Sequence, residues 1–192
     1  MYLHMAPHLL RDVALLIIDT GLRAGEAAAL EWRNVHLKAA SGPRFGYVHI
    51  SSGKSAKAKR NVSLTPRVAA MLETRRRGAG SNLVFSRNGK SVAVTSLDHE
   101  HAGFRALLGF PTDFVLHSLR HTMLTRLGET RADAFTIMRI AGHSSVVSQR
   151  YVHPSPESLE TAFERMDALN RERRGVRGSH KFRHADQFAF GG

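Results

Sequence analysis

The sequence of 192 residues contains no cysteine. This absence excludes a disulfide framework, a thiolate zinc site and a cysteine nucleophile. Long apolar runs are also absent: the longest, Val13 to Ile18, is far too short to span a bilayer. The N-terminus lacks the order of basic, apolar and small residues that marks a signal peptide. We therefore expect a soluble, cytoplasmic protein built mainly as one domain.

Acidic residues are scarce, with 16 Asp and Glu against 28 Lys and Arg, and the formal net charge is +12. Two stretches hold most of the excess. Residues 52–77 carry eight Lys or Arg and one Glu, and residues 171–192 carry six Lys or Arg and two acids. Concentrated positive charge suits a polyanion such as nucleic acid. A solvated basic surface, or a tail that aids solubility, has the same composition, so charge alone leaves both readings open.

The hydrophobic pattern predicts an α+β, mainly helical domain with one small antiparallel sheet. The expected helices cover residues 7–18, 25–32, 66–76, 97–108, 117–127, 133–141 and 157–170. The expected strands cover residues 47–51 and 61–64, joined by a polar turn that contains Gly53 and Lys54. The basic, glycine-containing segment 171–192 is expected to be disordered.

The first segment whose residues could bind or catalyse runs from Thr20 to Glu26. Arg23 stands just beyond a glycine break, at the start of an expected helix, where the free N–H groups of the helix N-terminus also attract anions. Glu26 is placed to hold the Arg23 guanidinium or to cap the helix. An ordinary surface Arg–Glu pair is the alternative interpretation.

The second segment is His117 to His121, in which His117, Arg120 and His121 share one helical face. The two histidines could bind a metal, but no Glu follows the first one and no third ligand is evident. Alternatively, Arg120 serves as a fork for phosphate oxygens and His117 as its hydrogen-bonding or proton-transferring partner. In that case His121 packs behind the site.

The third segment contains Gly142 and His143 at the end of an expected helix, followed by Tyr151. A single tyrosine is ordinarily a core or surface aromatic residue. Whether Tyr151 has a chemical role therefore depends on the other candidate residues in the sequence.

Together these segments resemble the catalytic domain of the tyrosine recombinase or phage integrase family. The matches occur in the family's order over roughly residues 7–168: Thr20-Gly21-Leu22-Arg23 with Glu26, Gly53-Lys54, His117-x-x-Arg120-His121, Gly142-His143, and Tyr151 within Gln149-Arg150-Tyr151-Val152-His153-Pro154. The resemblance implies the fold of the DNA breaking-rejoining enzymes. It also implies a catalytic domain over residues 1–170 without the family's N-terminal core-binding domain, and a basic tail over 171–192.

The resemblance implies a site-specific recombinase or integrase in which Tyr151 attacks a DNA phosphodiester. A 3′-phosphotyrosyl link forms and a 5′-hydroxyl is released, without a cofactor or a metal. By the same similarity Arg23 and Arg120 hold the phosphate, and His117 accepts or positions the tyrosine proton. His143 adds a hydrogen bond to the phosphate.

The remaining roles also follow from the resemblance. Lys54 protonates the leaving 5′-oxygen, with Lys57 and Lys59 as alternative donors. Lys57, Lys59 and Arg60 are expected DNA contacts. Glu26 and His121 support the site, and the implied assembly is a homotetramer on double-stranded DNA.

Three other functions remain open. His143 and Tyr151 are eight residues apart, whereas the family usually has about nine, so an inactive DNA-binding module of the same fold is the main alternative. A type IB topoisomerase would use the same chemistry. An RNA-binding basic protein would bind structured RNA more tightly than duplex DNA, but it leaves the ordered matches unexplained.

Overall fold

The computed structural model describes residues 1–37, 42–51, 59–130 and 132–142, and three helical positions, 164, 166 and 168. The chain divides into two compact units, Met1–Val152 and His153–Gly192. Every element below belongs to the first unit. Apart from those three positions, the predicted helix 157–170 and the predicted tail lie outside the described residues. The predicted domain boundary at residue 170 also falls there and stays a prediction.

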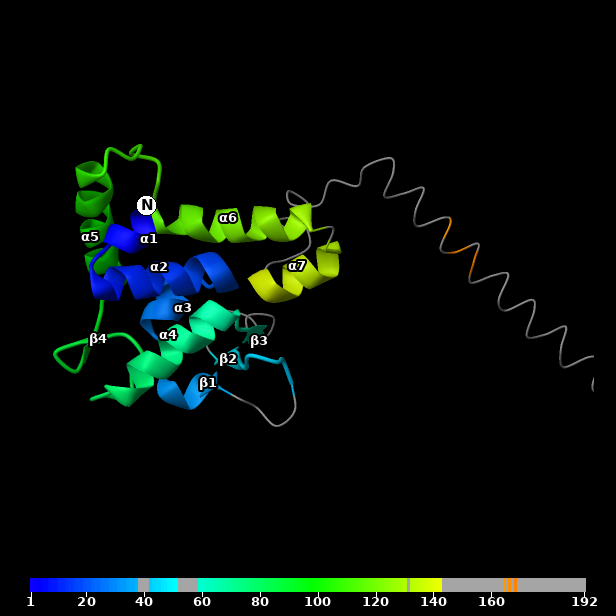
Figure 1. Ribbon diagram of the computed structural model, residues 1–192, viewed down its shortest axis with the longest axis horizontal. Coiled ribbons are helices and arrows are strands. Elements are labelled where there is room, and N and C mark those ends of the chain that lie inside the picture. Colours follow the sequence, from blue (N-terminus) through cyan, green and yellow to red (C-terminus); the bar gives the residue numbers. More distant parts are fainter. Residues whose placement is uncertain are drawn as a thin grey trace, which may run out of the picture. The chain divides into compact units, whose positions relative to one another are not determined.

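The first unit is mainly helical, with two small antiparallel sheets (Figure 1). Its helices are α1 (Tyr2–Met5), α2 (His8–Thr20), α3 (Ala24–Ala28), α4 (Pro66–Arg77), α5 (Val94–Leu107), α6 (Leu116–Glu129) and α7 (Ala134–Ala141), with a 3₁₀ turn η1 at Trp32–Asn34. One sheet has the order β1 (Val35–His36), β2 (Tyr47–Ile50), β3 (Arg60–Ser63); the other is the hairpin β4 (Ser86–Arg87) and β5 (Lys90–Ser91). The predicted α+β, mainly helical fold class is confirmed. No helix in the described ranges is long and apolar enough to cross a membrane.

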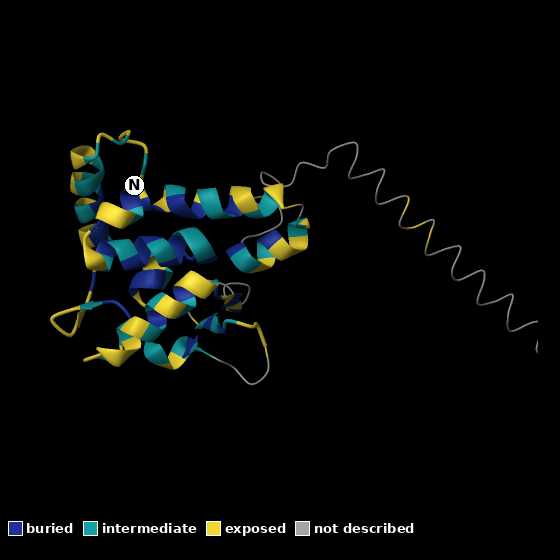
Figure 2. Ribbon diagram, viewed as in Figure 1, coloured by how far each residue is buried: buried dark blue, intermediate teal, exposed yellow. Residues whose placement is uncertain are grey.

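Helix α2 forms the centre of the core and packs against α3, α4 and α6. Its buried face is mostly apolar, with Asp12 and Thr20 as its polar members, and Figure 2 shows the buried positions along the helix. Gly21 ends the helix with φ +68°, and its N–H donates to the Ile17 carbonyl. A Cβ on Gly21 would lie 3.0 Å from the Met123 sulfur of α6. Glycine therefore lets the end of α2 approach α6 closely and turns the chain toward Arg23.

The predicted strands agree with β2 and β3 to within one residue, and Val48 pairs with Val62 across them. The prediction missed β1 and the β4–β5 hairpin, because strands of two residues are too short to show a period of two. The helix predicted over 25–32 is wrong beyond Ala28. There the chain extends instead, and the Leu30 carbonyl accepts a hydrogen bond from the Val84 N–H (2.8 Å).

Part of the positive charge of residues 52–77 faces inward. The Arg75 guanidinium pairs with the buried Asp12 carboxylate (2.8 Å), donates to the Val84 carbonyl (3.2 Å) and lies over the Phe85 ring. Arg67 pairs with Asp19. Arg75 is thus half-buried, and its charge is paired with a buried carboxylate instead of lying free on the basic surface.

Candidate active site

Arg23 occupies the N-cap position of α3, in extended backbone conformation. Its N–H donates to Glu26 Oε2 (2.9 Å), and its guanidinium donates to Glu26 Oε1 (3.0 Å) and to the Gly142 carbonyl (3.1 Å). Glu26 therefore caps the helix and holds the arginine at the same time. The Arg23 side chain is 40% exposed, so it is the more accessible partner of the Arg23–Glu26 pair.

Arg60 reaches the same place from β3 and is buried, with only 3% of its side chain exposed. Its Nη1 and Nη2 each donate to one Glu26 oxygen (2.9 Å), and its Nε donates to the Ile140 carbonyl (2.8 Å). The Arg60 guanidinium thus faces the interior in this structure, and the expected contact of Arg60 with DNA stays a prediction. The cause of the inward direction is the alternation of β3, which turns Arg60 and Val62 inward and Asn61 and Ser63 outward.

Arg120 of α6 is also buried, at 1% exposure. The guanidinium donates to the Gly21 carbonyl at the end of α2 and to the Ala141 carbonyl of α7 (2.7 Å). The Arg120 guanidinium, which is predicted to bind phosphate oxygens, faces main-chain oxygens in this structure instead of solvent.

The C-terminal end of α7 is therefore held by arginines from three different elements. Its carbonyls at Ile140, Ala141 and Gly142 accept hydrogen bonds from Arg60, Arg120 and Arg23, respectively. The carbonyl end of a helix carries partial negative charge, so cations are favourable there. We refer to Arg23, Arg60, Arg120 and Glu26 as the arginine cluster.

The carboxylate of the arginine cluster is stabilised in its ionised form. Burial alone would raise the pKa of Glu26. The hydrogen bonds from the Arg60 guanidinium and the Arg23 N–H, together with the charges of both arginines, outweigh burial and hold the pKa below its ordinary value.

His117 and His121 lie side by side on the first turns of α6, with ring centroids 4.6 Å apart and the rings nearly perpendicular. Both residues are exposed, so His121 does not pack behind the site as expected. Although His117 is exposed overall, neighbouring atoms partly desolvate its ring and so lower its pKa, and the charges of His121, Arg120 and Arg23 lower it further. His117 is therefore neutral at pH 7, where a ring nitrogen can accept a proton.

The structure brings together Arg23, Glu26, His117 and Arg120, which are up to 97 residues apart in sequence. Lys59 is exposed just before β3. Lys54, Lys57, His143 and Tyr151 lie outside the described residues, although His143 directly follows Gly142 in the sequence. Sequence reasoning missed the inward role of Arg60. Its alternation with Val62 was the available signal.

Gly142 is the point where α7 ends against this cluster, and its replacement gives a direct test of the packing. It adopts φ +61°, and a Cβ there would lie 2.9 Å from Arg60 Nη1. We expect Gly142→Ala to lower the free energy of unfolding by at least about 1–2 kcal/mol, since the left-handed conformation alone costs that much. Urea denaturation measures the change.

Gly103 is the matched control for this substitution. It lies inside α5, and a Cβ there would meet nothing within 4 Å. Gly103→Ala should therefore raise stability by about 0.8–1 kcal/mol, the difference in helix propensity. Equal effects of the two substitutions would contradict the proposed packing at Gly142.

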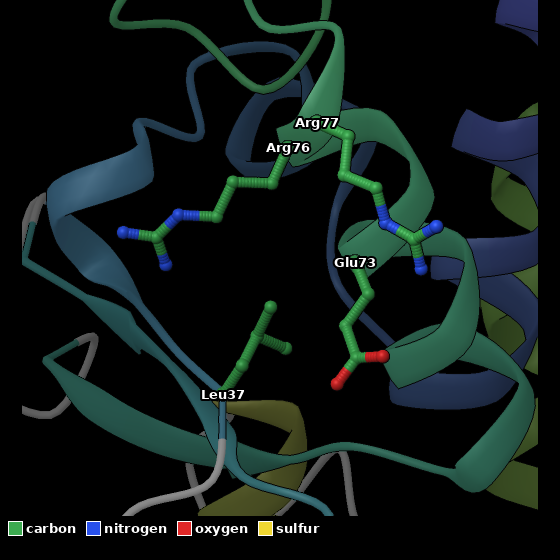
Figure 3. Close-up of a pocket in the computed structure, with 4 residues that line it drawn as sticks. All are labelled: Leu37, Glu73, Arg76 and Arg77. Atoms are coloured by element: carbon green, nitrogen blue, oxygen red, sulfur yellow. The ribbon is translucent and has the colours of Figure 1, made fainter.

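A pocket of about 390 Å³ lies elsewhere on the unit, between α4 and the residue after β1 (Figure 3). Leu37, Glu73, Arg76 and Arg77 line it, and none of these is a predicted site residue. Among the described residues, no group of three or more His, Asp or Glu side chains is placed to hold a metal ion.

Comparisons with known proteins show the family to which the chain belongs. The protein-family model described as "Phage integrase family" matches residues 4–158 of this chain. Tyrosine recombinase XerD of Lacticaseibacillus casei is 29% identical over 168 residues, covering 80% of this chain and 54% of that protein. Tyrosine recombinase XerC of Rhodospirillum centenum is 33% identical over 164 residues, covering 81% and 46%. The chain thus spans about half the length of these relatives.

Solved structures agree on the fold. The crystal structure of XerA recombinase superposes with a TM-score of 0.62 at 20% identity, covering 83% of this chain and 57% of that one. The XerH site-specific recombinase bound to difH substrate gives a TM-score of 0.64 at 22% identity, covering 84% and 50%. At these identities the likeness concerns the fold alone.

Proposed function

The chain belongs to the phage integrase family, and on that basis we propose that it is a site-specific recombinase or integrase that cleaves and rejoins double-stranded DNA. In this proposal Tyr151 attacks the scissile phosphodiester. The new bond joins the tyrosine oxygen to phosphorus, the bond from phosphorus to the 5′-oxygen breaks, and the 5′-oxygen leaves as a hydroxyl. Attack by a 5′-hydroxyl on the phosphotyrosine reverses the step, so neither ATP nor a metal is needed.

The observation that carries the proposal is the convergence of Arg23, Arg120 and His117 at the end of α7. Arg23 and Arg120 donate to the neighbouring carbonyls of Gly142 and Ala141, and the charges of both arginines act on the His117 ring. A phosphodiester gains negative charge on its non-bridging oxygens in the transition state. Preorganised guanidinium donors stabilise that charge.

The two arginines differ in how they would meet DNA. Arg23 is 40% exposed and is placed to receive a phosphate from solvent. Arg120 lies buried and holds the ends of α2 and α7. We propose that Arg23 is the outer and Arg120 the inner member of the pair that holds the scissile phosphate.

Proton transfer completes the proposed chemistry. A tyrosine hydroxyl has a reference pKa of about 10, so the attacking oxygen needs a proton acceptor at neutral pH. The lowered pKa of His117 supports this role for its neutral ring. We assign protonation of the leaving 5′-oxygen to Lys54, with Lys57 or Lys59 as alternatives, and a phosphate hydrogen bond to His143.

We propose double-stranded DNA as the partner and a homotetramer as the assembly on it. The excess of Lys and Arg supports a polyanionic partner. The second candidate function is a DNA-binding module of the same fold without catalysis. The eight-residue separation of His143 and Tyr151, one fewer than the family usually has, favours it.

Covalent trapping separates these two functions. The protein is incubated with a randomised pool of nicked duplexes that lose the 5′-hydroxyl strand after cleavage, and products are resolved in denaturant. We expect a protein–DNA adduct from the wild type and none from Tyr151→Phe, because phenylalanine lacks the attacking oxygen.

DNA binding is measured in parallel as a function of salt. Salt-sensitive binding without an adduct, together with adduct formation once one residue is inserted between His143 and Tyr151, would replace the recombinase with the inactive module. An adduct that survives Tyr151→Phe would show that another residue is the nucleophile.

A further inference from the structure

Within the arginine cluster, one buried side chain joins three segments that are distant in sequence: β3, α3 and α7. Arg60 starts β3, binds both carboxylate oxygens of Glu26 in α3, and donates through Nε to Ile140 in α7. The three contacts are 2.8–2.9 Å long, and the side chain is 3% exposed. Arg60 therefore fixes the end of α7 relative to α3.

The contacts of Arg60 reach the proposed phosphate-binding residue through a shared carboxylate. Glu26 Oε1 accepts from both Arg60 and Arg23, so the position of Arg23 depends on a carboxylate that Arg60 orients. The end of α7 is equally constrained, because Gly142 packs directly on the Arg60 guanidinium. His143 follows Gly142, and Lys54 lies six residues before Arg60. Arg60 thus contacts α3, which Arg23 caps, and the end of α7, which His143 follows in the sequence.

The presence of arginine at position 60 favours a role in positioning neighbouring groups as well as in stability. A buried ion pair is weak evidence for net stability, since well-packed apolar residues often serve as well. Arginine alone offers a rigid planar fork that can reach two carboxylate oxygens and a carbonyl at once. We propose that Arg60 is a positioning residue for DNA cleavage: it aligns Arg23 and the C-terminal end of α7 and makes no DNA contact itself. This inference rests on the proposed DNA cleavage.

The test compares Arg60→Lys with Arg75→Lys. Lysine keeps the charge, but its single ammonium cannot make all three contacts of Arg60. We expect adduct formation at saturating DNA to fall about 10²-fold, the effect of an ångström-scale misplacement. DNA affinity and the slope of log affinity against log salt should stay within two-fold of the wild type. Arg75→Lys disturbs a comparable Arg–carboxylate–carbonyl arrangement away from the site, and should leave the cleavage rate unchanged.

Two outcomes would overturn the positioning role. Wild-type cleavage by Arg60→Lys shows that the alignment does not need arginine. A loss of affinity with a salt slope reduced by about one shows that Arg60 binds a phosphate directly. Circular dichroism verifies that both variants are folded.

Amide hydrogen exchange adds a readout that does not depend on catalysis. In Arg60→Lys the amides of residues 138–142 should exchange at least ten-fold faster, while those of α5 stay unchanged; in Arg75→Lys the α7 amides should keep their wild-type rates. Unchanged α7 exchange in Arg60→Lys would refute the coupling. If the wild type itself forms no adduct but the α7 amides respond as expected, the proposed function fails and the coupling stands.

Discussion

Replacing Arg120 with lysine is expected to lower the rate of adduct formation at saturating DNA by about 10²–10³-fold, the usual loss when one preorganised transition-state donor is removed. The Arg120 guanidinium spans the Gly21 and Ala141 carbonyls, which belong to different helix ends. A lysine ammonium is a point charge and cannot reproduce this planar arrangement. The measurement is single-turnover trapping on nicked duplexes, well below the unfolding temperature.

Stability is measured on the same variant, because Arg120 also supports the fold. Leaving one buried carbonyl unsatisfied should cost about 1–3 kcal/mol, which urea denaturation detects. Arg126→Lys, an exposed position on the same helix, should change stability by less than about 0.5 kcal/mol and leave trapping unchanged. If Arg120→Lys forms adduct within about three-fold of the wild-type rate, Arg120 does not hold the phosphate.

The sequence predicts the long elements well because their signals are local. Pro66 and Gly78 bracket α4, and Asp133 and Gly142 bracket α7, where the Asp133 carboxylate accepts hydrogen bonds from the first-turn N–H groups. The end of α3 has no comparable signal. Alanines favour continuing that helix, but pairing between Leu30 and Val84 extends the chain, and those residues are 54 positions apart.

The sequence also predicts which residues belong to the candidate site, but it does not predict the directions in which their side chains point. Periodicity places His117, Arg120 and His121 on one face of a helix. It does not reveal that Arg120 turns inward while His121 stays exposed beside His117. The difference depends on what α6 packs against, and α2 supplies the Gly21 carbonyl that receives Arg120. Direction is therefore decided by tertiary contacts.

Glu26→Gln is expected to lower the free energy of unfolding by about 3–5 kcal/mol at pH 7, since it leaves the buried Arg60 charge uncompensated. The effect should depend on pH. The folded-state pKa of Glu26 lies below its ordinary value of 4.5, so its contribution is complete above that pH and is lost as the pH falls through the folded pKa. The difference between wild type and variant should thus be constant near neutrality and shrink below about pH 4.5. Denaturation at a series of pH values measures it.

Glu31→Gln is the matched control, because Glu31 pairs with the largely exposed Arg33 at the surface. Glu31→Gln should lower the free energy of unfolding by no more than about 1 kcal/mol. An equal cost at both positions, or a Glu26 effect that grows in acid, would contradict the assignment of Glu26 as the compensating charge.

A double variant separates what the ion pair does for stability from what it does for cleavage. Replacing Glu26 and Arg60 together with methionine removes both buried charges, so much of the stability lost in Glu26→Gln should return. Cleavage should not return, because Arg23 then has neither its helix-capping partner nor the carboxylate that orients its guanidinium. Recovery of both properties would mean that the pair only fills space. Recovery of stability alone would mean that the charges are kept for the geometry of the site.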